Sequence, residues 1–240
     1  MDVPPDRTPE PRQRWRLVVG RTADAPRISS REVVEAWEAA FVASDLPVAW
    51  DVGRARPRIS FGAPLGPDVE AEGELIDIVL VERMPTWRVR EALEGRLPEG
   101  WAIVDLFDVW LAGPPLAGRV AAADHRVVLS EEVGTPGVGG PVDAVAIARA
   151  ASTLLATRTL PRERPKGAGT VRYDLRPLLL DVAVADAGPP VVIRARTRFH
   201  PELGTGRPEE VVAALGDMLG RVLVPARIVR ERLLLGEDLG

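Results

Sequence analysis

The stretch GELIDIVLVE, residues 73–82, decides the fold. Its side chains alternate along an extended chain, so Leu75 and Asp77 point to one face and Ile76 and Ile78 to the other. This alternation over ten residues predicts a β-strand more firmly than any other segment of the sequence does.

The elements predicted around this strand follow a fixed order. In the first half they are a strand at 14–20, a helix that begins at Ser29 or Ser30 and ends near Asp45, strands at 46–50 and 58–62, a helix at 86–97 and a strand at 101–111. Together they read β-α-β-β-α-β with one extra hairpin, which is a split βαβ or ferredoxin-like arrangement.

The segment GPPLAG, residues 113–118, interrupts this order, which then starts again. The second half is predicted to hold a strand at 119–129, a helix at 142–157, a hairpin of 171–185 with 191–199, a helix at 207–219 and a strand at 226–235. We therefore predict an α+β protein of two tandem ferredoxin-like units with antiparallel sheets. A mobile Pro-rich tail at 1–13 precedes unit one at 14–112 and unit two at 113–240.

The composition excludes several classes of chemistry. The chain of 240 residues is 46% hydrophobic, which is enough for a substantial core, and it has no cysteine for disulfides, thiolate metal sites or nucleophiles. Its two histidines, His125 and His200, leave little for a metal site or a general base, and each is predicted to be a surface or hydrogen-bonded residue. We therefore expect no catalytic residue, metal or cofactor.

The same composition bears on location. No stretch reaches the roughly 18 apolar residues that span a membrane, and the N-terminus lacks an apolar signal core. These features predict a cytoplasmic protein with no membrane contact.

Basic residues gather in two regions despite a net charge of −4. Only Lys166 is a lysine, and this excess of arginine is typical of a GC-rich genome, so abundance alone does not indicate phosphate recognition. The residues that could bind a polyanion such as RNA are Arg56, Arg58, Arg164, Lys166, Arg172, Arg176, Arg194 and Arg196. The alternative is a solvated surface whose arginines pair with Asp174, Asp181 or Glu231.

Three further sequence patterns, an acidic run, a glycine-rich run and the tryptophans, can be explained by structure as well as by function. The alternating Glu70, Glu72 and Glu74 could hold magnesium, act as acid and base, dock a basic partner, or form a solvated edge. The glycine-rich run at 134–140 lacks the spacing of a phosphate-binding loop and is predicted to be a flexible connection. All six tryptophans lie in the first half and are predicted to fill its core and the seam between the halves.

The sequence resembles a bacterial family of unknown function named for its link to radical SAM enzymes. The resemblance rests on LPVAW at 46–50, PRISF at 57–61, the acidic run, the Ile76-Asp77-Ile78 core, DLRP at 174–177, RPEE at 207–210 and RIVR at 227–230. It assigns motif positions to Glu72, Glu74, Asp77, Asp174, Arg176 and Arg207. Where the family has Ser-His-x-Asp, this chain reads Ser-Ser-Arg-Glu at 29–32. The resemblance implies a partner of a radical SAM enzyme and no established reaction.

Three functions follow as hypotheses. The first is a non-catalytic accessory module that binds RNA or another acidic partner beside a radical SAM enzyme. The second is a protein-interaction domain whose acidic strand docks that enzyme without nucleic acid. The third is a metal-independent RNA-processing enzyme similar to the tandem-ferredoxin endonucleases of CRISPR systems.

Overall fold

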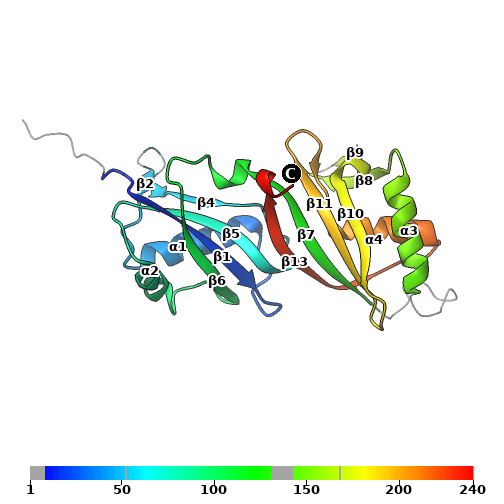
Figure 1. Cartoon of the computed structure of the whole chain (residues 1–240), viewed down its shortest axis with the longest axis horizontal. Helices are drawn as coiled ribbons and strands as arrows, with labels where there is room; N and C mark the ends of the chain where they lie inside the picture. Colours follow the sequence, from blue (N-terminus) through cyan, green and yellow to red (C-terminus); the bar gives the residue numbers. More distant parts are fainter. Residues whose placement is uncertain (1–8, 52, 54, 131–142, 168, 240) are drawn as a thin grey trace, which may run out of the picture. The chain divides into compact units, whose positions relative to one another are not determined.

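The computed structural model describes residues 9–51, 53, 55–130, 143–167 and 169–239. The chain divides into two compact units, unit 1 at residues 1–120 and unit 2 at residues 121–240. Figure 1 shows the elements of both. Among the residues described, no helix is long and apolar enough to cross a membrane.

Unit 1 is built from long strands and two α-helices. Its elements in chain order are β1 (Gln13–Arg21), α1 (Ser30–Ala43), β2 (Trp50–Asp51), β3 (Arg56–Pro57), β4 (Ile59–Phe61), β5 (Glu70–Leu80), α2 (Thr86–Leu93), β6 (Trp101–Val109) and a 3-10 turn, η1 (Leu116–Gly118). β5 pairs antiparallel with β1 and β4, and β6 pairs antiparallel with the other edge of β1. The strands of this unit therefore follow the order β4-β5-β1-β6, and β2 and β3 form a separate short hairpin.

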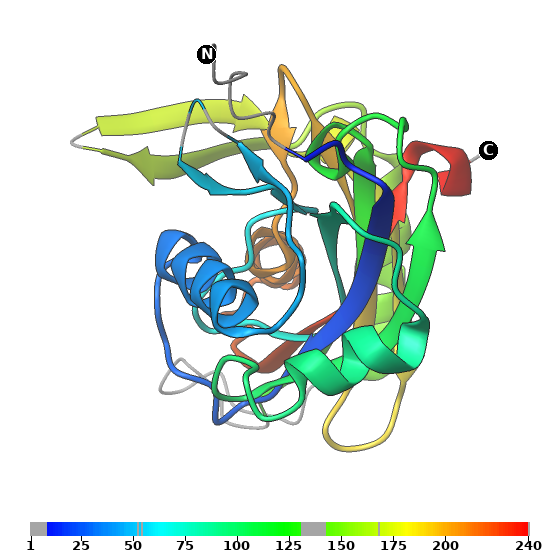
Figure 2. The same ribbon diagram turned by 90° about the vertical axis from the view of Figure 1, so that its left-hand side faces the viewer.

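One apolar core holds unit 1 together. Helix α1 begins with a capping box, in which the Ser29 hydroxyl accepts from the Glu32 N–H and the Glu32 carboxylate accepts from the Ser29 N–H. The buried side of α1 carries Trp37 and Phe41, which pack with Leu17 of β1. Helix α2 contributes to the same cluster, so both helices cover the same face of these strands. Figure 2 shows α1, in blue, facing β1 across this core.

Unit 2 has a sheet, a ribbon and two α-helices. Its elements are β7 (Val120–Leu129), α3 (Ala144–Ala156), β8 (Pro161–Lys166), β9 (Gly169–Asp174), η2 (Arg176–Leu178), β10 (Leu179–Asp186), β11 (Val192–His200), β12 (Gly204–Thr205), α4 (Pro208–Leu219), β13 (Pro225–Leu235) and η3 (Gly236–Leu239). The strands of its sheet follow the order β10-β11-β7-β13, with β12 on β11.

Two segments of unit 2 differ from the sequence prediction. The basic segment at 161–166, where the sequence predicts neither a helix nor a strand, is strand β8, which pairs with β9 in a separate two-stranded ribbon. The predicted strand at 171–185 is divided between β9 and β10 by the turn η2. A proline within that turn, Pro177, interrupts the run because it has no N–H to donate to a ladder.

The predicted fold class is wrong. The described residues hold thirteen strands and four α-helices, and their main sheet is mixed, with parallel as well as antiparallel pairs, which two ferredoxin-like units with antiparallel sheets would not contain. The physical reason is that period-two alternation identifies a strand and its two faces, whereas the pairing of strand edges depends on backbone hydrogen bonds between segments that are distant in sequence. Sheet membership is therefore not encoded in the local pattern from which the fold class was predicted.

Candidate functional site

A buried charge cluster lies on the face of β1 and β5 opposite the apolar core of unit 1. Arg14 and Arg16 alternate with the core residues Trp15 and Leu17, so both arginines share the other face of β1. Antiparallel pairing places Arg16 directly across from Asp77 of β5. In the local sequence RWRL, the apolar side chains therefore lie in the core, and the two arginines lie on the opposite face of β1, beside Asp77 of β5.

Asp77 neutralises only one of these two arginines. Its carboxylate accepts from Arg16 Nε at 2.7 Å and Nη2 at 3.0 Å, and from Arg14 Nε at 3.0 Å. All three side chains are buried, and Asp77 is 1% exposed. Two guanidinium groups and one carboxylate leave this buried cluster with a net positive charge.

A polar cavity of about 240 Å³ opens beside the cluster. Arg14, Arg56 and Arg58 line it together with Asp51 and Asp77, and we call it the arginine pocket. The remaining lining residues are Pro57, Ile59, Ser60, Val79, Leu111, Gly113 and Pro115. The pocket lies wholly within unit 1.

The backbone around the arginine pocket is firmly held. Arg14 donates from Nη1 to the carbonyl of Gly113 at 2.9 Å and from Nη2 to that of Pro114 at 3.0 Å. The Arg58 N–H donates to the Ala49 carbonyl at 2.7 Å, and the Arg58 carbonyl accepts from the Val79 N–H at 3.2 Å. Arg56 stands opposite Asp51 in the short hairpin of β2 and β3. The arginine side chains therefore project from fixed backbone positions.

Exposed tryptophans lie beside this pocket. Trp110 is 75% exposed, and a Cβ atom placed on Gly113 would lie 3.5 Å from its ring and 3.6 Å from Arg14 Nη1, so the indole and the guanidinium group both flank Gly113 of the pocket lining. Trp50 is 46% exposed and pairs in register with Pro57 of the pocket wall. The prediction that the tryptophans fill the core holds for Trp15 and Trp37, whereas Trp50, Trp87 and Trp110 are exposed.

The second basic cluster is distributed over several local interactions in unit 2. The Arg164 guanidinium lies 4.8 Å above the ring of Tyr173, and Arg172 pairs with Glu163 across the ribbon of β8 and β9. Burial, and after it the neighbouring Glu210, raises the pKa of Tyr173. Lys166 lies in β8, and its side chain is outside the described residues, as is Arg54 of the first cluster.

Arg176 and Asp174 have structural roles. Arg176 donates from Nε and Nη2 to the carbonyl of Leu155, at 3.1 and 2.7 Å, and from Nη1 to that of Leu179. Leu155 belongs to the last turn of α3, where carbonyl groups lack helical partners, so Arg176 caps that helix. Asp174 accepts from the N–H groups of Leu160 and Arg176 and fixes the turn. These contacts explain the DLRP motif without a ligand.

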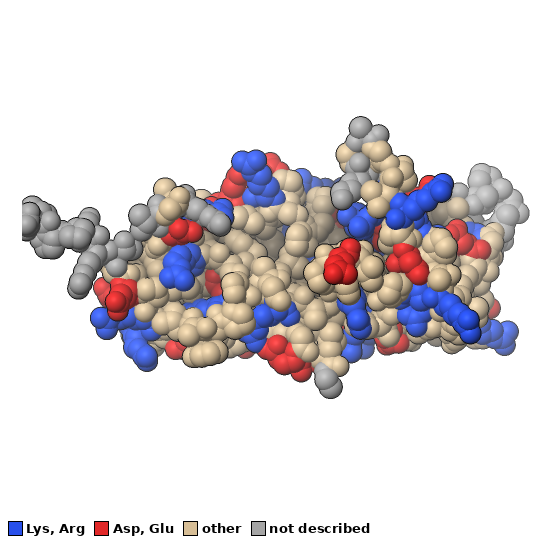
Figure 3. All heavy atoms as spheres, turned by 90° about the horizontal axis from the view of Figure 1, so that it is seen from above, with Lys and Arg blue, Asp and Glu red and all other residues tan. Residues whose placement is uncertain are grey.

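Two of the three arginines of β11, Arg194 and Arg196, pair with carboxylates. Asp124 accepts from Arg196 at 2.6 Å and from Arg232 at 2.8 Å. Burial opposes ionisation of Asp124, but the hydrogen bonds from these two arginines outweigh it and keep its pKa below the ordinary value. Arg194 pairs likewise with Glu231 at 3.3 Å. On the face that Figure 3 shows, basic and acidic side chains are interspersed in the same way.

The acidic positions do not gather into a metal site. Glu72 is exposed, while Glu74 is buried in the wall of an apolar cavity. Among the described residues, no group of three or more His, Asp or Glu side chains is arranged to hold a metal ion. Arg207 is the exposed N-cap residue of α4 and makes no side-chain capping bond. The glycine-rich run at 134–140 is outside the described residues.

The structure thus brings together Arg56 and Arg58 and adds residues that sequence reasoning missed. Arg14 and Trp110 were absent from the predicted site, although both stand beside it. For Arg14, the sequence contains no local signal of the contact with Asp77, which depends on the pairing of β1 with β5. For Trp110, the signal was its place between a strand and the turn-forming Gly113-Pro114.

Comparison with known proteins gives a family and no activity. A family model described as "Uncharacterized protein conserved in bacteria (DUF2344)" matches residues 14–208. No curated protein matches. Among solved structures, a chain in the crystal structure of the archaeal box H/ACA sRNP Nop10-Cbf5 complex is similar, with 12% identity and a TM-score of 0.43. The match covers 89% of this chain and 47% of that one, so this chain spans about half its length. At this TM-score the likeness supports no inference about function.

Proposed function

Because the chain belongs to the uncharacterized bacterial family DUF2344, whose description names no reaction, we propose from its own residues that it binds single-stranded RNA at the arginine pocket. In this proposal a backbone phosphate sits among Arg14, Arg56 and Arg58, and a neighbouring base stacks on Trp110. The observation that carries it is a cavity lined by three arginines with a solvent-exposed indole beside it.

The charge of the pocket favours an anionic group. The lining carries three arginines against two aspartates. Arg16 pairs with Asp77, and Arg56 lies 3.9 Å from the carboxylate of Glu38, so four arginines stand against three carboxylates around the pocket. Arg14 is buried, so its charge is only weakly screened by solvent and acts strongly on an ion in the cavity. The guanidinium groups of Arg56 and Arg58 match phosphate oxygens in geometry, since each can donate two parallel hydrogen bonds. Arg14 already donates to Asp77, Gly113 and Pro114, so in this proposal it contributes its charge rather than a two-fold hydrogen bond.

The exposed tryptophan favours a single strand over other polyanions. Unpaired bases stack on aromatic side chains, and such contacts contribute about 1–3 kcal/mol per base. A protein ligand with acidic side chains would use the arginines but would not need a free indole next to them. Interspersed charges elsewhere argue against a long basic groove for duplex RNA on the face shown in Figure 3.

We expect Arg56→Gln together with Arg58→Gln to weaken binding of a fluorescent oligouridylate of about ten nucleotides. The dependence of log affinity on log salt should become shallower by about 0.7 for each lost phosphate contact. The measurement is fluorescence anisotropy across a salt series. The matched control is Arg172→Gln with Arg194→Gln, which removes two arginines that already pair with Glu163 and Glu231 and should leave the slope unchanged.

Equal slopes for both double variants, or no binding by the parent protein at low salt, would refute the phosphate site. The length of the RNA recovered after incubation distinguishes the hypothesis of RNA binding from that of RNA processing. The proposal expects the oligonucleotide to be intact, whereas shortened products formed without added metal would favour the RNA-processing hypothesis.

The resemblance to radical SAM-linked proteins adds a partner to this proposal. In this extended proposal, the protein holds RNA beside a radical SAM enzyme. Both proteins would act in the cytoplasm, which is the location predicted from the sequence. Affinity purification from the native host, with protein and RNA both identified, tests this part. Recovery of a radical SAM enzyme supports it whether or not RNA is present, and recovery of RNA without such an enzyme would overturn it.

A further inference from the structure

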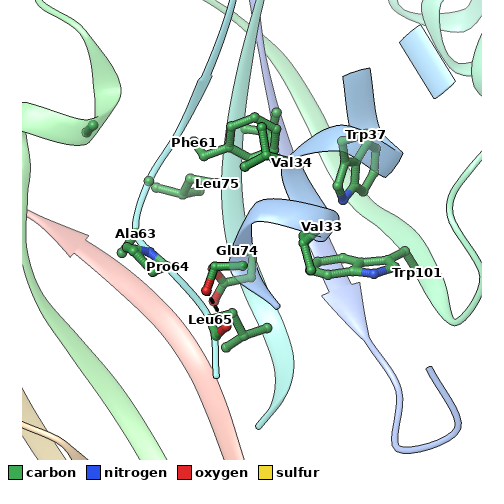
Figure 4. A pocket seen from close by; sticks show the side chains of 14 residues that line it. Val33, Val34, Trp37, Phe61, Ala63, Pro64, Leu65, Glu74, Leu75 and Trp101 are labelled. Carbon is green, nitrogen blue, oxygen red and sulfur yellow. Dashed lines mark hydrogen bonds between the residues drawn. The ribbon is translucent and has the colours of Figure 1, made fainter. Parts of the chain in front are cut away.

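A second cavity, of about 260 Å³, lies in unit 1 between α1 and the segment that follows β4. We call it the aromatic pocket. Its lining includes Trp37, Phe61, Trp101 and Glu74, and it shares no residue with the arginine pocket. Figure 4 shows these side chains around one space, with Glu74 near Leu65. Apart from Glu74 and Ser30, the side chains in this lining are apolar or aromatic.

The aromatic wall is preorganised. Trp37 is fully buried, and its ring meets that of Trp101 edge to face, with centroids 5.7 Å apart and planes at 81°. The Trp37 Nε1–H has no hydrogen-bond acceptor, and Figure 4 shows this nitrogen on the side of the ring toward Trp101. An N–H directed at an aromatic face is a weak but favourable contact, so the two indoles stabilise each other without a ligand.

The opposite wall is also fixed. Ser30 Oγ of α1 donates to the Leu65 carbonyl at 3.1 Å, which ties the helix to the segment. Arg21 donates to the carbonyls of Gly66 and Pro67 at 2.9 Å and to that of Pro26 at 2.8 Å. Burial lowers the pKa of Arg21, while the charges of Asp68 and Glu74 act in the other direction. The cavity is therefore bounded by tethered backbone.

The chemistry of the lining specifies a ligand. Glu74 is 5% exposed, so its carboxylate is buried in a mostly apolar lining, and its charge also acts on the buried Arg21. Glu74 makes contacts within the protein, and a carboxylate can accept several hydrogen bonds at once, so the proposal places a ligand donor beside those contacts. Aromatic faces attract cations through their quadrupoles. A carboxylate among aromatic rings thus selects a protonated amine over a neutral or anionic head group.

The volume limits the size of that ligand. Sites for drug-sized molecules usually exceed about 300 Å³, whereas a cavity of about 150 Å³ accepts benzene. The aromatic pocket lies between these values. We propose that it binds a small primary amine with one aromatic ring, the ring between Trp101 and Phe61 and the ammonium group at Glu74. This site is independent of the RNA proposal.

The test uses three probes of similar size: phenethylamine, 2-phenylethanol and phenylacetate. None fluoresces like tryptophan, so quenching of protein fluorescence reports binding next to Trp37 and Trp101. We expect affinity in the order amine, alcohol, acid. Glu74→Gln should lower the affinity for the amine about tenfold and leave that for the alcohol nearly unchanged, because a charge-assisted hydrogen bond becomes a neutral one.

A second pair of variants does not touch the buried carboxylate. Val34 is half-buried in α1 and lines the cavity, so Val34→Phe should fill it and abolish binding of the amine. Val42 is exposed on the same helix outside the cavity, and Val42→Phe should bind as the parent does. Preference for phenylacetate, equal binding by the Val34 and Val42 variants, or no binding of any probe would overturn the proposal.

Discussion

Replacement of Asp77 by asparagine is expected to destabilise unit 1 by about 3–5 kcal/mol, because it leaves two buried guanidinium groups without a counter-charge. Asparagine keeps the shape of the side chain, so the loss reports charge rather than packing. All six tryptophans belong to unit 1, and urea unfolding followed by tryptophan fluorescence therefore measures this unit.

The matched control is Asp68→Asn. Asp68 pairs with Arg27 at 3.3 Å on the surface, where an ion pair contributes about 0–1 kcal/mol. If the two variants lose similar stability, the Arg14–Asp77–Arg16 cluster is not the buried charge centre described above. A larger loss for the Asp77 variant would assign this carboxylate to the support of the arginine pocket.

The second large effect concerns His125 of β7 in unit 2. This side chain is 4% exposed, and burial together with the nearby charge of Arg230 lowers its pKa to about 4 from an ordinary value of 6.5. The backbone at Ala195 and the charge of Asp124 act in the opposite direction without overcoming burial. The imidazole is therefore neutral in the folded protein at pH 7.

Because the folded pKa is lower than the unfolded one, the unfolded chain takes up the proton first as pH falls. Stability is full above pH 6.5 and is lost between pH 6.5 and 4, in total by about 3 kcal/mol. His125→Leu removes this group with little change in volume. Urea unfolding followed by circular dichroism at pH 7, 5.5 and 4 should show a smaller acid loss in the variant. An identical pH dependence in both proteins would show that His125 is not a buried neutral group.

The α-helices could be predicted closely from local signals. The third helix was expected at 142–157 and spans Ala144–Ala156, and the fourth was expected at 207–219 and spans Pro208–Leu219. Helical periodicity and N-terminal proline or capping residues act within a few positions, so a single sequence contains them. The sheet could not be predicted, because edge pairing joins distant segments.

The candidate site could be predicted only in part, for the same reason. Arg56 and Arg58 stand out locally as a basic segment before a strand. Arg14 contacts Asp77 across 63 positions of sequence, and nothing near Arg14 indicates that contact. Arg194 and Arg196 looked equally suited to phosphate, but carboxylates on neighbouring strands engage both. Composition shows which charges exist, whereas only the fold shows which of them face a cavity.

The most direct measurement is photocrosslinking of the oligouridylate carrying 5-bromouracil, followed by mass spectrometry of the crosslinked peptides. Stacking on Trp110 would place the base against the indole, so we predict that the main crosslink is at Trp110. We also predict that it disappears in the Arg56→Gln, Arg58→Gln protein and persists in the Arg172→Gln, Arg194→Gln control. Crosslinks confined to unit 2, or a Trp110 crosslink that the first double variant leaves unchanged, would contradict RNA binding at the arginine pocket.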